Sequence, residues 1–101
     1  MGWQVACTVS DLAENEMKEF DLGGASVLVA RNTDGFFAYP PLCPHQESEL
    51  AFGTCDGDLI TCMTHLWQWD MRSGAPVGLA AQPLKLYPTR IEGDRVFVLL
   101  D

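Results

Sequence analysis

Two short segments of the chain carry side chains that bind soft metal ions. The first contains Cys43-Pro44-His45 and the second Cys62-Met63-Thr64-His65, with sixteen residues, Gln46 to Thr61, between them. Together they use both histidines of the chain. Two thiolates and two imidazoles are a donor set suited to zinc or to an iron–sulfur centre. The spacing therefore predicts a metal site.

The way the ligands are shared between the segments separates the candidate sites. Zinc fingers usually group Cys with Cys and His with His, whereas each segment here provides one of each. A catalytic thiol–imidazole pair needs one Cys and one His, which leaves the second pair without a role. A [2Fe-2S] centre with two His in place of two Cys on one iron uses all four residues. A zinc-stabilised interaction module built on the same four residues remains the alternative.

The residues around these ligands resemble a known signature. Cys43-Pro44-His45-Gln46 and Cys62-Met63-Thr64-His65-Leu66-Trp67 are similar to the cluster loops of small Rieske ferredoxins from multicomponent diiron monooxygenases, which act on toluene, isoprene or other alkenes. The resemblance implies one Rieske [2Fe-2S] cluster, with the two cysteines on the inner iron and the two histidines on the outer iron.

The resemblance implies an electron carrier and not an enzyme. In that family the carrier takes electrons from an NADH-dependent flavin and iron–sulfur reductase and passes them to a diiron hydroxylase for aromatic or alkene oxidation. The chain has no Gly-rich phosphate loop for a nicotinamide or flavin, and its histidines are already used. We expect no small-molecule substrate, and a monomer that visits two partners. Ferredoxins of ring-hydroxylating dioxygenases and small Rieske subunits of nitrite reductases are alternatives.

Residues next to the ligands are candidates for partner docking. Pro44, Gln46 and Glu47 accompany the first Cys–His pair, and Leu66 and Trp67 follow the second. Leu66 and Trp67 can form an apolar rim for a partner, although Trp67 suits core packing beneath the loop equally well.

Acidic residues dominate the part of the chain that contains the ligands. The net charge is -8; residues 1–60 hold ten acidic and two basic side chains, and residues 61–101 hold four of each. No Lys or Arg occurs between Arg31 and Arg72. Nucleic acid is excluded as a partner because its binding depends on cationic side chains. The charge fits a protein partner with a basic docking patch, and equally an acidic surface that only maintains solubility.

The rest of the chain supplies short strands that hold the two segments. Its 101 residues suit one domain, residues 1–101. Alternating or β-branched runs between Gly, Asn and Asp turns predict strands at 3–7, 17–22, 25–31, 36–39, 59–61, 67–70, 84–91 and 95–100. A single helical turn is expected at 10–14 and a loop at 75–83. The prediction is an all-β domain of antiparallel strands.

The family resemblance adds detail to this fold. It implies a Rieske fold in which a cluster-binding subdomain, about residues 40–84, is inserted between antiparallel sheets and formed by two hairpin loops. Gln82-Pro83 resembles the loop that shields the cluster from water in the family, and Trp69 is expected in the core.

The sequence also bears on the cellular location of the protein and on the state of its other two cysteines. The longest apolar run, Val96 to Leu100, has the length of a strand, and the N-terminus lacks the features of a signal peptide. We expect a cytoplasmic protein with no membrane association. In that reducing compartment Cys7 and Cys55 are expected to be free thiols.

Overall fold

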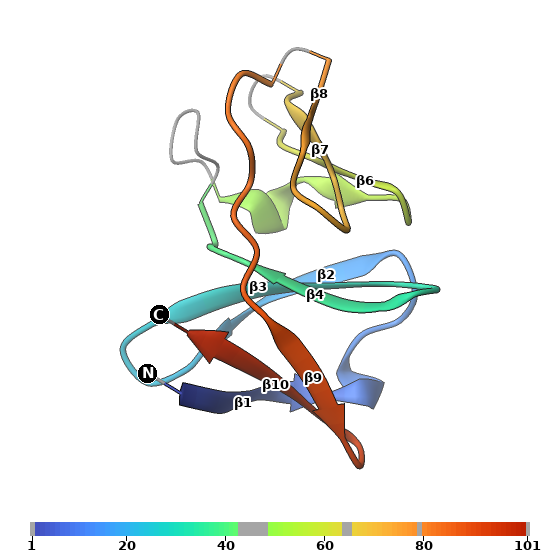
Figure 1. Ribbon diagram of the computed structural model, residues 1–101. Helices are drawn as coiled ribbons and strands as arrows, with labels where there is room; N and C mark the ends of the chain where they lie inside the picture. Colours follow the sequence, from blue (N-terminus) through green and yellow to red (C-terminus); the bar gives the residue numbers. More distant parts are fainter. Residues whose placement is uncertain (1, 43–48, 64–65, 79, 101) are drawn as a thin grey trace.

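The computed structural model describes residues 2–42, 49–63, 66–78 and 80–100, which form three antiparallel sheets (Figure 1). The first sheet joins both ends of the chain in the order β1 (Gly2–Thr8), β10 (Arg95–Leu100), β9 (Thr89–Glu92). The second has the order β2 (Glu16–Asp21), β3 (Ser26–Asn32), β4 (Gly35–Tyr39). The third contains β5 (Thr54–Cys55), β6 (Leu59–Thr61), β7 (Gln68–Asp70) and β8 (Pro76–Val77). Two 3-10 turns, η1 (Val9–Asp11) and η2 (Leu50–Phe52), complete these elements.

The second sheet is the middle layer of the molecule, and β3 is buried on both of its faces. Val27 and Val29 pack with Val96 and Val98 of β10 in one core. The alternate residues of β3, such as Leu28, belong to a second core shared with the third sheet. Successive side chains of a strand point to opposite faces, so a strand between two cores must be apolar throughout. The uninterrupted apolar run of β3 is therefore explained by its central position.

Polar contacts join the third sheet to the middle sheet. The hydroxyl of Tyr39 donates a hydrogen bond to the Met71 carbonyl at 2.5 Å, and the Asn32 amide donates to the Gly57 carbonyl at 2.6 Å. Burial raises the pKa of Tyr39 well above its ordinary value, so its hydroxyl remains a hydrogen-bond donor. These bonds hold the turns of the third sheet against the layer below.

The all-β prediction is confirmed, with one strand placed wrongly. The expected strand 84–91 begins only at Thr89. Before that residue, the Leu84 amide donates to the Gly74 carbonyl and the Tyr87 amide to the Ala38 carbonyl, both at 2.8 Å. Because these amides bond to two different sheets, the segment cannot form one continuous ladder. The two-residue strands β5 and β8 were not expected, and β8 lies inside the predicted loop 75–83.

The helical content is small. The single turn predicted at 10–14 lies instead at Val9–Asp11, where the Asp11 carboxylate accepts the Thr8 amide at 2.8 Å. Neither of the two turns that the described residues form has the length and hydropathy needed to cross a membrane.

Gly53 allows the chain to enter β5 close to β6. A Cβ at this position would lie 1.9 Å from the Thr61 carbonyl oxygen, so Gly53→Ala must displace backbone. We expect a loss of about 2–3 kcal/mol in the free energy of unfolding, measured in urea. Gly93→Ala is the control, because Gly93 has a φ of 63° but a Cβ added there would meet nothing within 4 Å. A smaller loss at Gly53 than at Gly93 would contradict the close-approach argument.

Candidate metal centre

Of the four predicted ligands, the structure describes Cys62. Cys43, His45 and His65 lie outside the described residues. Cys62 directly follows β6, is 1% exposed and is not part of a disulfide bond. It belongs to the second core, together with Trp69 and Leu84. A soft sulfur donor in an apolar surrounding at the start of a loop fits the cysteine side of an iron–sulfur site.

The second ligand loop is closed at its base by a backbone hydrogen bond. The Cys62 amide donates to the Trp67 carbonyl at 2.8 Å. Within the loop, Leu66 adopts a φ of 58° and is 63% exposed, and Met63 is 58% exposed. The left-handed region costs a non-glycine residue about 1–2 kcal/mol. The loop therefore holds a strained, exposed leucine immediately after the predicted ligand His65.

The first ligand loop has a closed base as well. Leu42 and Glu49 form an isolated antiparallel bridge on either side of it, and the Leu50 amide donates to the Pro41 carbonyl at 3.0 Å. Leu50 is fully buried in the same core as Cys62. Both loops therefore start from one packed core.

The register of the third sheet brings the bases of the loops together. Thr54, the first residue of β5, pairs with Thr61, the last residue of β6, and Thr61 also pairs with Gln68 at the start of β7. The chain that returns from the first loop thus lies beside the strand that enters the second (Figure 1). This arrangement places the two entry points at one end of the sheet, as a shared site requires.

Two tryptophans pack beside this end of the sheet. Trp69 is fully buried, as predicted, and its indole N–H donates to the Gln82 carbonyl at 2.8 Å. Trp67 is half-buried against the same core, with its ring edge-on to Trp69 at a centroid distance of 6.2 Å. The Trp69–Gln82 bond was not predicted, because no local pattern identifies a carbonyl partner thirteen residues away.

The third sheet and its surroundings carry a negative charge. Residues 32–84 contain six acidic side chains and one basic side chain, Arg72. Arg72 forms ion pairs with Asp34 and with Asp58, the latter at 3.0 Å, and these bonds raise the pKa of the Arg72 guanidinium. Backbone N–H groups of Leu59 and Asp58 lower the pKa of Asp56. The Asp56 carboxylate is therefore ionised at neutral pH.

The two cysteines outside the predicted ligand set are free thiols, as expected. Burial raises the pKa of both Cys7 and Cys55 to about 11, with smaller contributions from nearby carboxylates. Both are therefore protonated at neutral pH, whereas a metal ligand must be a thiolate.

A comparison with protein families identifies the chain. A model of the Rieske [2Fe-2S] domain matches residues 2–88. The chain belongs to this Rieske family. As a Rieske protein it carries one [2Fe-2S] cluster, which confirms the predicted cofactor and leaves the zinc alternative without support. When bound, such a cluster takes up and releases one electron, at a potential raised by its histidine ligands.

Several known Rieske ferredoxins are similar to this chain. The methanesulfonate monooxygenase ferredoxin subunit of Methylosulfonomonas methylovora is 35% identical over 101 residues, covering 99% of this chain and 82% of the relative. The ferredoxin component of the alkene monooxygenase system of Xanthobacter autotrophicus (strain ATCC BAA-1158 / Py2) is 39% identical over 94 residues, 91% and 76% of the two chains.

A solved structure supports the fold assignment. It is a complex of reduced oxygenase and oxidized ferredoxin in carbazole 1,9a-dioxygenase, which matches with a TM-score of 0.86 and 28% identity over 96% of this chain and 92% of the other. This Rieske protein is therefore a ferredoxin, the electron carrier of an oxygenase system and not its catalytic component.

Proposed function

We propose that this ferredoxin passes electrons from an NADH-dependent flavin reductase to the diiron hydroxylase of a multicomponent monooxygenase, with Cys43, His45, Cys62 and His65 as cluster ligands. The observation that carries the proposal is the 39% identity to the alkene monooxygenase ferredoxin. It agrees with the Cys-Pro-His-Gln and His-Leu-Trp sequences of the two loops. The hydroxylase oxidises an aromatic or alkene substrate that this chain does not touch.

The proposal includes the organisation of the molecule. Residues 1–101 form one domain, with residues 40–84 as the cluster-binding subdomain. The insertion of the third sheet between β4 and β9, and its hydrogen bonds to the middle sheet, support this division. We take the carrier to be a cytoplasmic monomer, because it must alternate between two partners and its reductase uses NADH.

A comparison of electron transfer to two different oxygenases tests the proposed partner class. The reduced ferredoxin is mixed without oxygen with the oxygenase component of the Xanthobacter alkene monooxygenase system, and separately with that of carbazole 1,9a-dioxygenase. Stopped-flow absorbance follows its reoxidation. We expect the first reaction to be faster by about tenfold, which corresponds to 1.4 kcal/mol. Faster reaction with the dioxygenase component would favour the alternative, a ferredoxin of a ring-hydroxylating dioxygenase.

We also propose that the hydroxylase docks at the exposed apolar residues of the second loop. Leu66 and Met63 are more than half exposed and flank the predicted ligand His65. Interfaces place apolar side chains at the centre and polar ones at the rim. The remaining docking candidates, Pro44, Gln46, Glu47 and Trp67, stay part of this proposal.

Charge reversal at the base of the first loop should slow docking. Glu49 is exposed and follows the loop directly. For Glu49→Lys we expect electron delivery to the hydroxylase to fall about threefold at low salt, because attraction to a basic patch raises association rates. The effect should shrink as the Debye length falls from about 30 Å at 0.01 M to about 10 Å at 0.1 M salt.

Asp94→Lys is the matched control for this charge change. It alters the net charge equally, but Asp94 lies in the turn between β9 and β10, at the end of the molecule away from the third sheet (Figure 1). Delivery by this variant should match the unmodified protein. Equal slowing by both variants would show that only net charge matters, and no salt dependence for Glu49→Lys would remove the acidic docking surface.

A further inference from the structure

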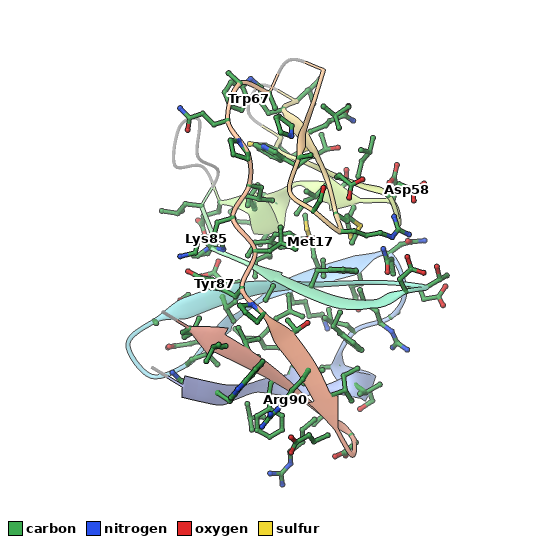
Figure 2. All side chains as sticks on the ribbon, viewed as in Figure 1. Met17, Asp58, Trp67, Lys85, Tyr87 and Arg90 are labelled. Atoms are coloured by element: carbon green, nitrogen blue, oxygen red, sulfur yellow. The ribbon has the colours of Figure 1, made fainter. Side chains whose placement is uncertain are left out.

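Residues 80–88, called the strap below, run from the third sheet down to β9 (Figure 1). Ala80, Leu84 and Leu86 of the strap pack against the core that contains Cys62. Figure 2 shows Trp67 beside the upper end of this path, with Lys85 and Tyr87 farther along it. The strap therefore covers one side of the apolar surroundings of the predicted sulfur ligand.

Two hydrogen bonds fasten the strap to the hairpin of β7 and β8. The Trp69 indole N–H donates to the Gln82 carbonyl, and the Leu84 amide donates to the Gly74 carbonyl, both at 2.8 Å. At the second point the backbones are in close contact, since a Cβ on Gly74 would lie 1.9 Å from the Leu84 carbonyl oxygen. The bond to the Gln82 carbonyl is different, because its donor is the side chain of Trp69.

The indole group does more than fill the core. Trp69 is 0% exposed, and a buried N–H without a partner costs about 1–3 kcal/mol. A phenylalanine would supply a similar apolar ring without a donor. The Trp69 indole N–H donates to the backbone carbonyl of Gln82 in the strap, thirteen residues away. This bond fixes where the strap lies.

We propose that Trp69 is a positioning residue whose indole N–H holds the strap closed over Cys62 and keeps water from the cysteine side of the cluster. The proposal rests on the ligand role of Cys62 given above. Its physical basis is that the apolar shell around a metal site controls solvent access, and through it the redox potential. An open strap would admit water to this shell without changing any ligand.

Trp69→Phe in the cluster-loaded protein tests the proposal. Hydrogen–deuterium exchange in peptides covering the strap should become about tenfold faster, as loss of one buried hydrogen bond predicts. The cluster should be lost severalfold faster to an iron chelator. The midpoint potential should rise, because water stabilises the negative charge added on reduction. Should the phenylalanine variant fail to fold, a tryptophan analogue with sulfur in place of the indole N–H retains the packing.

Tyr39→Phe is the control, since it removes a buried hydrogen bond of the same core whose acceptor, the Met71 carbonyl, is not part of the strap. It should leave the potential and the relative exchange of the strap unchanged. The proposal fails if Trp69→Phe changes neither the midpoint potential nor the exchange of the strap. It also fails if strap exchange rises while the potential stays unchanged, or if Trp69→Phe and Tyr39→Phe shift the potential equally. None of these measurements uses an oxygenase, so a wrong partner assignment would not affect them.

Discussion

Replacing Cys62 with serine should abolish cluster binding. A serine hydroxyl is not ionised at neutral pH and cannot replace the thiolate that iron–sulfur clusters require. Cys62 is almost completely buried at the base of the second loop, so no other described thiol can take its place without a rearrangement of the core. We expect iron and acid-labile sulfide per chain to fall at least about tenfold, and the visible absorption and reduced-state EPR signal to disappear. Because metal binding contributes to folding, stability should fall as well.

Cys55→Ser separates ligation from packing. Cys55 is a free thiol, half-buried against the same core as Cys62, and burial raises its pKa to about 11. This variant should keep full iron and an unchanged EPR signal. Similar iron loss in both variants would mean that the core, and not the ligand, had been disrupted. Stoichiometric zinc and no colour in the unmodified protein would return the zinc-stabilised module to consideration.

The ligand set is predicted from the sequence alone because its information is local. Each Cys–His pair lies within four residues, and metal coordination restricts which residue types can serve. The central strand β3 could also be predicted from the sequence, since Val27 to Ala30 form a β-branched and apolar run. These features depend on neighbours in the chain. The structure confirms β3 and the strand at 59–61 that leads to Cys62.

Other features depend on contacts between distant segments. The start of β9 could not be predicted, because the amides of Leu84 and Tyr87 find their acceptors on two different sheets. The two-residue strands β5 and β8 exist only through pairing with β6 and β7. The left-handed backbone of Leu66 follows from closure of the loop between Cys62 and Trp67. A leucine in the sequence does not predict this conformation.

Removing the Leu66 side chain should reduce electron delivery to the proposed hydroxylase partner about tenfold, the loss expected if this leucine makes an apolar contact at the centre of the proposed interface. Leu66→Ala and Leu66→Gly remove the same contact, so their delivery rates should agree. Their stabilities should differ, because glycine adopts the observed φ of 58° without steric cost, whereas alanine keeps the strain. We expect the glycine variant to be about 1 kcal/mol more stable than the alanine variant in urea unfolding.

A comparison with Ile91→Ala shows whether the effect belongs to this surface. Ile91 is 48% exposed on β9, whose sheet lies across the middle sheet from the third sheet (Figure 1), so its truncation should leave delivery unchanged. If both Leu66 variants deliver electrons normally, the leucine has no docking role and its strain needs another cause. If instead their rates differ while stability does not, the backbone and not the side chain controls transfer. A strained leucine that is 63% exposed beside the predicted ligand His65 fits the proposed docking role.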